Sequence, residues 1–361
     1  MTAVSFAPVT PGSRVRRPLR APEPELHSIV ASDGVPLRLT RYRAGDRGPV
    51  LLVHGLGVSS RIFTVDTIAT NLLEFLGSNG FDVWLLDCRV SIDLPSSTVP
   101  WTADDVARKD YPAAVAAVRS ATGSAGIDAI VHCYGATTFF MAMLAGLEGV
   151  RSAVCSQIAT HVLVPRAMRL KARLRLPTLL RAAGVGALTA RADEGAGGWK
   201  RAYDGALRFL PVPAPERCQS AVCHRISFMY GRLYQHEQLS EATHASLSEL
   251  FGISTMAAFE QLARMVNRRQ LVTADGRDDY LPRLDRLAIP ITFIHGALNA
   301  CYLPASTAAA VEALVAENGG DLYERHVIPG YGHIDCIFGK NAAVDVYPLM
   351  LRHFHRIGSG S

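Results

Sequence analysis

The sequence has no long uninterrupted apolar run, little excess of charge and too few cysteines for a disulfide framework. No window reaches the roughly eighteen consecutive apolar residues of a membrane span, so we expect no transmembrane segment. The net charge of +5 over 361 residues is modest and does not predict binding to nucleic acid. Seven cysteines, an odd number spread thinly along the chain, favour a reducing, cytoplasmic location.

The two ends of the chain also lack the pattern of a folded element. Residues 1–25 are rich in Pro and Arg and have no apolar core of a signal peptide, so we expect a flexible N-terminal arm. Residues 358–361, with the sequence GSGS, indicate a flexible tail. The part between them is large enough for one α/β domain with an insertion, or for two domains.

Short apolar runs alternate with helical patterns along much of the chain. This alternation predicts a parallel sheet with right-handed crossovers, in which ligands bind beyond the carboxyl ends of the strands. A hairpin is expected at 27–42, around a Ser-Asp-Gly turn. The other predicted strands are 49–53, 81–86, 128–131, 152–157, 289–294 and 322–328, and the predicted helices include 67–77, 103–122 and 306–318.

The chain is organised around GIDAIVHCYGATTFF, from Gly126 to Phe140. A predicted strand and a predicted helix leave a tight turn between them with Cys133 at its apex, which is the geometry of a nucleophile elbow. The usual pattern of that elbow is G-x-S-x-G. Here Val131 stands in place of the first Gly and Cys in place of Ser, with His132 just before the Cys. The alternative is a buried thiol without chemistry.

A second loop of interest follows the predicted strand 49–53. It has the sequence HGLG and consists of His54, Gly55, Leu56 and Gly57. In nucleophile-elbow enzymes such a loop supplies the second donor of an oxyanion hole. We therefore predict that the N–H groups of Leu56 and Tyr134 form this hole. The alternative is a tight turn with no further role.

A Gly-rich loop near the end of the chain, PGYGHI at 329–334, holds His333. A His at this place fits the order nucleophile, acid, His and predicts the catalytic base. An ordinary hydrogen-bonded loop histidine is the alternative. The position where the acid is expected, in the loop after strand 289–294, holds Asn299.

An Asn in the acid position is consistent with a Cys nucleophile. Its amide can accept the Nδ1–H of His333, and a thiol can pass its proton to a neighbouring imidazole in the resting state. We therefore expect a Cys-His-Asn constellation that rests as thiolate and imidazolium. A carboxylate from elsewhere is the competing third member, and the nearest candidates in sequence are Asp275, Asp278 and Asp279.

The interval 159–285 is mostly helical and predicts a cap between two parts of the core, 26–158 and 286–357. Its segment 166–208 holds ten Lys or Arg against three acidic residues. This basic face predicts peripheral contact with a membrane or with an anionic acyl donor such as CoA or an acyl carrier, and a solvated face is the alternative. The predicted substrate-binding residues are His54, Gly55, Gly57, His132, His161 and Tyr230.

Cysteines and histidines also gather in the cap, at Cys218, Cys223, His224, His236 and His244. Their spacing matches no compact metal-binding motif. We therefore expect no metal site, and no sequence feature calls for another cofactor.

Taken together, these motifs resemble the α/β-hydrolase superfamily from Val30 to about His355. The resemblance implies a mostly parallel central sheet flanked by helices, with a helical cap inserted after the strand that follows the elbow. The segments DGVPL at 33–37 and FDVWL at 81–85 are similar to acid lipases. The Cys nucleophile also resembles that of polyhydroxyalkanoate synthases and dienelactone hydrolases.

A closer resemblance is carried by HCYGATTFF, YLPRLDRL and PGYGHIDCIFGKNA. These segments are similar to a hydrolase domain found in actinobacteria beside cholesterol-oxidase-like flavoproteins. The resemblance implies a hydrophobic or sterol-like ester as substrate and a redox enzyme as a candidate partner.

We therefore expect an enzyme that forms an acyl-enzyme on Cys133 and hydrolyses a hydrophobic ester, lactone or thioester. The first alternative is an acyltransferase, because an acyl thioester remains reactive toward alcohols, amines or carbon nucleophiles if the cap excludes water. The second alternative is an inactive hydrolase fold that serves as a binding module.

Overall fold

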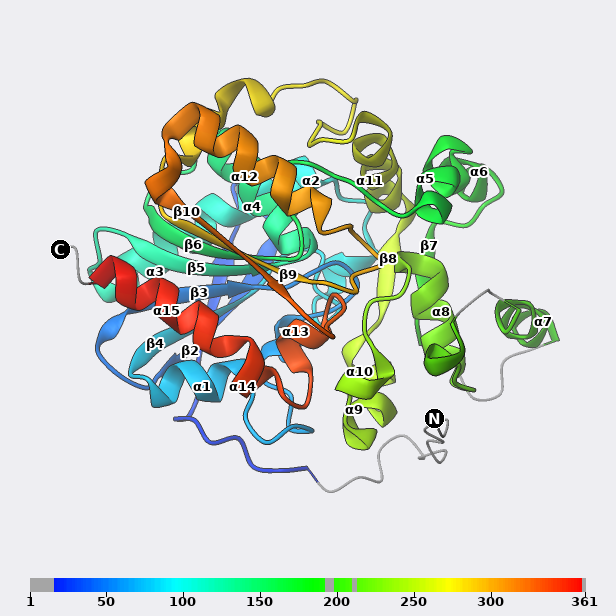
Figure 1. Cartoon of the computed structure of the whole chain (residues 1–361), viewed down its shortest axis with the longest axis horizontal. Coiled ribbons are helices and arrows are strands. Elements are labelled where there is room, and N and C mark those ends of the chain that lie inside the picture. Colours follow the sequence, from blue (N-terminus) through cyan, green and yellow to red (C-terminus); the bar gives the residue numbers. More distant parts are fainter. Residues whose placement is uncertain (1–15, 192–197, 210–212, 359–361) are drawn as a thin grey trace.

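The computed structural model describes residues 16–191, 198–209 and 213–358. Its centre is an eight-stranded sheet in the order β1-β2-β4-β3-β5-β6-β9-β10 (Figure 1). β2 pairs antiparallel with both β1 and β4, and the other neighbours run parallel. The strands are β1 (Glu25–Val30), β2 (Pro36–Arg43), β3 (Arg47–Val53), β4 (Phe81–Asp87), β5 (Ile127–His132), β6 (Val150–Ser156), β9 (Ile291–Gly296) and β10 (Tyr323–Ile328).

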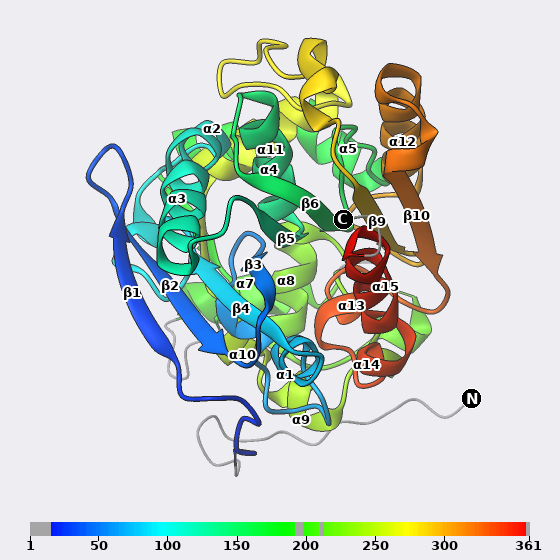
Figure 2. The same cartoon turned by 90° about the vertical axis from the view of Figure 1, so that its left-hand side faces the viewer.

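Helices cover both faces of the sheet, as the apolar run of its central strands requires. One face carries α1 (Leu72–Ser78) and α15 (Tyr347–Gly358), and the other carries α3 (Tyr111–Thr122), α4 (Tyr134–Leu144) and α12 (Ala305–Asn318) (Figure 2). β4 and β5 are buried along their whole length. The predicted mostly parallel sheet flanked by helices is therefore confirmed.

The cap is inserted between β6 and β9, beyond the carboxyl ends of the parallel strands (Figure 1). It is mostly helical, with one small antiparallel sheet of β7 (Ala187–Thr189) and β8 (Ile253–Thr255). Its helices are α5 (Arg166–Arg173), α6 (Leu176–Ala182), α7 (Gly198–Leu207), α8 (Ala221–Tyr230), α9 (Glu241–Ala245), α10 (Leu247–Leu250) and α11 (Met256–Arg268). The remaining helices of the core are α2 (Ala103–Asp105), α13 (Asp335–Phe338) and α14 (Ala342–Asp345).

Two helices differ from the sequence prediction. α1 begins at Leu72 and not at residue 67, because Asn71 and Glu74 form a reciprocal capping box there. The helix predicted over 103–122 is interrupted by a π-helical turn, Val106–Asp110. This turn carries the buried Asp110, whose carboxylate accepts hydrogen bonds from the Arg89 backbone and guanidinium.

The expected N-terminal arm lies partly outside the described residues. In its described part, Arg17 and Arg20 donate hydrogen bonds to the buried carboxylate of Glu74 on α1. The predicted tail, residues 359–361, also lies outside the described residues. Within the described ranges, the helices are all too short or too polar to cross a membrane.

Candidate active site

Cys133 occupies a strained turn between β5 and α4. Its backbone has φ 56° and ψ −124°, a conformation that side-chain-bearing residues rarely adopt and that tends to occur at functional sites. Val131, which replaces the first Gly of the usual pattern, is fully buried in β5 and pairs with Val53 and Cys155. The missing glycine is therefore accommodated within the sheet and does not prevent the turn.

Two backbone N–H groups point at the Cys133 thiol. They belong to Leu56 and Tyr134, and their hydrogen bonds to the sulfur favour the thiolate. The HGLG loop comes this close because Gly55 has no side chain, since a Cβ on Gly55 would lie 2.9 Å from the Cβ of Cys133. The structure thus places the predicted pair of donors around the sulfur, where an oxyanion formed by attack would also lie.

The ring of His333 contacts Asn299, but not in the predicted way. Asn299 Nδ2 lies 3.0 Å from His333 Nδ1, while Asn299 Oδ1 accepts the backbone N–H groups of Cys301 and Tyr302 at 2.9 and 3.0 Å. Asn299 Nδ2 also donates to Gln157 Oε1 at 3.0 Å. These bonds fix which end of the amide faces the ring.

The consequence concerns the tautomer of His333. An amide NH₂ group can only donate, so Nδ1 accepts and the ring proton of neutral His333 resides on Nε2. The prediction that Asn299 accepts the Nδ1–H is therefore wrong. Within the described residues, the buried Nε2 has no hydrogen-bond partner, which leaves its N–H for a substrate group.

Burial also argues against a resting ion pair. It raises the pKa of Cys133 to about 12, against the opposing effect of the Tyr134 and Leu56 N–H groups. Burial lowers the pKa of His333 well below its usual range, and the neighbouring His132 and His295 lower it further. Both shifts favour a neutral thiol and a neutral imidazole in this closed arrangement over the predicted thiolate–imidazolium pair.

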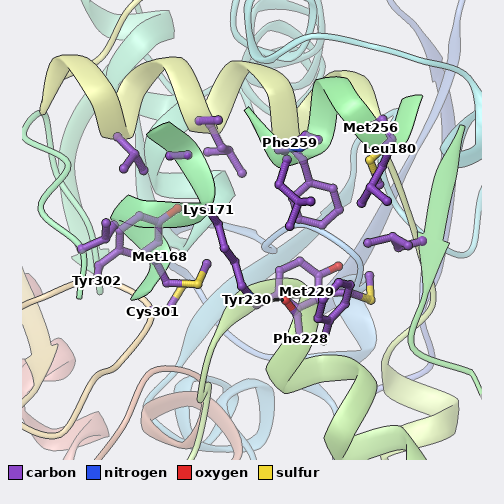
Figure 3. Close-up of a pocket in the computed structure, with 18 residues that line it drawn as sticks. Met168, Lys171, Leu180, Phe228, Met229, Tyr230, Met256, Phe259, Cys301 and Tyr302 are labelled. Carbon is purple, nitrogen blue, oxygen red and sulfur yellow. Dashed lines mark hydrogen bonds between the residues drawn. The ribbon is translucent and has the colours of Figure 1, made fainter. Parts of the chain in front are cut away.

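Cys133 and His333 line one small cavity of about 30 Å³, together with Gly55, Leu56 and Tyr134. A second cavity of about 110 Å³ lies under the cap (Figure 3). The two cavities share four lining residues, Tyr230, Leu262, Cys301 and Tyr302. They therefore adjoin, and the second cavity leads away from the thiol.

The larger cavity is apolar. Its 18 lining residues come from α5 and the segment before it, α6, β7, α8, α11 and the loop after β9, and include Met168, Phe228, Met229 and Phe259 (Figure 3). Among these 18 residues only Lys171 carries a charge, and its Nζ donates to the Phe228 carbonyl at 2.9 Å. The cavity is thus suited to a hydrocarbon chain attached to a group at Cys133.

Several other predicted residues have supporting places. The Tyr230 hydroxyl forms a hydrogen bond of 2.6 Å with the Ser254 hydroxyl. Tyr230 also covers Gly57, where a Cβ would lie 2.0 Å from the Tyr230 oxygen.

Two predicted histidines lie around the small cavity. His132 lines it, with its Nδ1 3.1 Å from Ser156 Oγ. His54 lies beneath the loop, with Nδ1 2.7 Å from the Gly55 carbonyl.

The remaining predicted residues do not join the site. His161 pairs with Gln270 and is not among the residues that line either cavity. Asp275 and Asp279 pair with Arg277 in the loop after α11, and Asp278 is exposed. His333 Nδ1 contacts Asn299 and not one of these carboxylates.

Sequence reasoning missed Gln157, Cys301 and Tyr302. Gln157 directly follows β6 and has a positive φ of 79°. Its side-chain Oε1 accepts hydrogen bonds from Asn299 Nδ2 and from the backbone N–H of Gly296. A polar residue just past the carboxyl end of the strand next to the elbow was the signal that could have identified it.

The structure also removes the argument against a metal site in the cap. Cys218, Cys223, His236 and His244 lie with their potential ligand atoms all within 4.8 Å of one another. His224, the fifth residue of the sequence group, is not in this cluster and instead contacts the Cys218 carbonyl. Spacing along the chain did not indicate this proximity, because the four residues come from three separate segments: α8 with the residues just before it, the turn at His236 and α9.

Comparisons with known proteins agree with this fold. Residues 50–345 match a protein family described as "Alpha/beta hydrolase family". Lipase 1 of Drosophila melanogaster is 30% identical over 129 residues, which is 33% of this chain and 29% of the fly protein. The chain thus spans less than a third of that relative.

Solved structures of similar shape share little sequence. A lipase in an open form has a TM-score of 0.60 at 14% identity, covering 93% of this chain and 99% of that one. An esterase of Pyrococcus furiosus has a TM-score of 0.51 at 15% identity, covering 96% and 99%. The family match spans most of the sequence, and the chain belongs to the α/β-hydrolase family.

Proposed function

We propose that the protein is an acyl-enzyme-forming hydrolase that uses Cys133 as nucleophile on a hydrophobic thioester or ester. The observation that carries this proposal is the strained Cys133 itself, held between two N–H groups at the end of an apolar cavity. A thiol without chemistry needs neither the strain nor the donors.

In the proposed reaction, the Cys133 sulfur attacks the acyl carbonyl carbon and forms an S–C bond. The carbonyl electrons move to oxygen, and the N–H groups of Leu56 and Tyr134 stabilise that charge. Collapse breaks the bond to the leaving group and gives an acyl-Cys133 thioester. Water then attacks this thioester, releases the carboxylic acid and returns the thiol.

The tautomer of His333 restricts the substrate class. Its Nε2–H can donate a hydrogen bond to the leaving group, but Nε2 cannot accept the thiol proton. The proton of Cys133 must therefore leave through solvent or after rotation of Asn299, and the leaving group takes its proton from solvent. Thiolates leave more readily than alkoxides because their conjugate acids are stronger. We therefore propose thioesters, such as acyl-CoA or acyl-carrier conjugates, as better substrates than alkyl esters. Sterol-type esters, lactones and a redox-enzyme partner are the finer possibilities that the family resemblance adds.

The test is intact-mass spectrometry after brief exposure to acyl thioesters and to esters with the same acyl chain. We expect an adduct of one acyl group on the wild type and none on Cys133→Ala. Cys301→Ala is the matched control, because Cys301 lines the same cavities and, among the residues that the structure describes, only its backbone N–H and not its thiol makes a hydrogen bond. An adduct that persists in Cys133→Ala or vanishes in Cys301→Ala would refute the assignment.

Acyl transfer is a second candidate, and the same Nε2–H favours it. Without a general base, water attacks the acyl-enzyme slowly, so an amine or thiol acceptor can compete. The decay of the adduct in water and with added acceptor separates the two activities. Faster decay with formation of the acylated acceptor supports transfer, and unchanged decay supports hydrolysis.

A binding module is a third candidate, and the neutral state of Cys133 and His333 favours it. Failure of every acyl donor to form an adduct, together with full occupancy of the apolar cavity by a fatty acid, would support this reading over both enzymes.

We also propose that the cap contacts anionic membrane surfaces. Leu170, Leu174 and Leu179 on α5, α6 and their connection are 57–60% exposed, and Arg169 and Arg173 lie exposed beside them. These helices also roof the apolar cavity. Binding to anionic vesicles should exceed binding to neutral vesicles and should fall at least several-fold when the three leucines are replaced by Ser. Equal binding by this variant would contradict the proposal.

A further inference from the structure

The cap contains a cluster of two thiols and two imidazoles outside the candidate active site. Cys218 lies just before α8, Cys223 in its first turn, His236 in the turn His236–Gln238 and His244 in α9. Their four potential ligand atoms all lie within 4.8 Å of one another, and Cys223 Sγ is 3.2 Å from His244 Nε2. Ligands bound to a tetrahedral zinc ion at about 2.0–2.3 Å lie roughly 3.3–3.8 Å apart.

We propose that these four residues bind one Zn²⁺ ion as a Cys₂His₂ site. Two thiolates and two imidazoles are a ligand set that selects zinc over harder cations such as Mg²⁺ or Ca²⁺. Four protein ligands complete the tetrahedron and leave no position for water, so the site is structural and not catalytic.

The surroundings of the cluster fit this role. His236 Nδ1 lies 2.7 Å from Glu216 Oε2, which leaves the other ring nitrogen, Nε2, for the metal. A carboxylate behind a ligand imidazole is the usual partner that orients it. The Tyr234 hydroxyl donates to Cys223 Sγ at 3.0 Å, as a hydrogen bond to a metal thiolate would. Glu216, Cys223 and Tyr234 are all buried.

The site would fix the cap against the active-site loop. The carbonyl of Leu233, three residues before His236, accepts the backbone N–H groups of His333 and Ile334 at 2.8 and 2.7 Å. α8, which holds Cys223 near its start, ends at Tyr230 over the oxyanion loop. Zinc would therefore hold both Tyr230 and the His333 loop in place without touching the reacting atoms.

The first test is zinc content. The full chain, produced with zinc and purified without chelator, should contain about one zinc per chain by elemental analysis. Co²⁺ exchanged into the protein should show the visible bands of a tetrahedral site and thiolate-to-metal charge transfer. Cys218→Ser and His244→Ala should each lose most of the zinc. His224→Gln should keep it, because His224 lies beside Cys223 on α8 but outside the cluster.

The second test reads the consequence for the fold. Chelation should lower the melting temperature by roughly 10 °C and increase hydrogen exchange at His333 and Ile334, and added Zn²⁺ should reverse both changes. Cys133→Ala should keep its zinc, so this proposal stands or falls separately from the proposed reaction. Wild-type protein with little zinc and two free thiols would overturn the proposal, and so would a Cys218–Cys223 disulfide found by mass spectrometry of the alkylated protein.

Discussion

The protein has two groups of cysteine and histidine, and they differ in what surrounds them. Cys133 and His333 border apolar cavities, and within the described residues His333 Nε2 has no hydrogen-bond partner. In the cap cluster, Cys223 contacts His244 and Tyr234, and His236 contacts Glu216. The first group is a largely buried thiol beside an apolar cavity, with two backbone N–H groups near it. The second is a set of four side chains whose thiol and imidazole atoms lie close to one another and contact Glu216 and Tyr234. These different surroundings are the basis of the two proposed roles, nucleophile for Cys133 and zinc ligands for the four cap residues.

The largest expected effect comes from a change to the proposed nucleophile of the first group. Cys133→Ser should lower thioester turnover by roughly 10³-fold or more, because a hydroxyl is a far weaker acid than a thiol and His333 Nε2–H offers no base to assist it. Steady-state kinetics with one acyl thioester measures this. Cys301→Ala should stay within about threefold of wild type. A Ser variant with near-wild-type turnover would show that another residue is the nucleophile.

The pH dependence of alkylation tests whether the Cys133 thiol is neutral at neutral pH. A pKa of about 12 leaves very little thiolate at neutral pH, so the alkylation rate of Cys133 should rise about tenfold per pH unit, or about 100-fold from pH 7 to pH 9. Peptide-resolved mass spectrometry with iodoacetamide measures the rate. A thiolate–imidazolium pair would instead give a fast rate that is flat over this range.

The sequence predicted the first group because its parts are local. A strand followed by a tight turn marked Cys133, and Gly-rich loops after strands marked the donors and His333. Long-range contacts decided what it could not predict. The orientation of Asn299 depends on the N–H groups of residues 301 and 302 and on Gln157. The cap cluster depends on the packing of α8 against the turns that carry His236 and His244, so sequence spacing had no predictive value there.

The next largest expected effect is on zinc affinity, and it comes from a change to Glu216, the carboxylate that contacts His236. Glu216→Gln keeps the size of the side chain but removes the carboxylate that orients His236, so zinc affinity should fall by about 10- to 100-fold. Competition with a chromophoric chelator measures the affinity. Glu260→Gln, a change to another largely buried carboxylate in the cap that pairs with Arg181, is the matched control and should leave zinc affinity unchanged. Equal affinities of both variants would mean that Glu216 does not support a metal ligand.

The smallest expected effect comes from Asn299→Asp, which converts the His333 environment toward that of a carboxylate triad. Asp can keep the backbone N–H groups of Cys301 and Tyr302 on one oxygen and accept the Nδ1–H of His333 on the other. This frees Nε2 to act as base and raises the pKa of His333. Hydrolysis of alkyl esters should rise by about tenfold, and hydrolysis of thioesters less, because thiolates need less help to leave.

The gain is limited by Gln157, because its Oε1 already accepts the Gly296 N–H and would face the new carboxylate. The ratio of ester to thioester turnover therefore tests the tautomer better than either rate alone, since misfolding lowers both. Asn299→Ala, which removes the donor to Nδ1 but supplies no carboxylate, should lose about 10- to 100-fold in turnover because the His333 ring is no longer oriented. An Asp variant with the wild-type ratio and the wild-type His333 pKa, measured by NMR, would show that Asn299 does not set the proton position on His333.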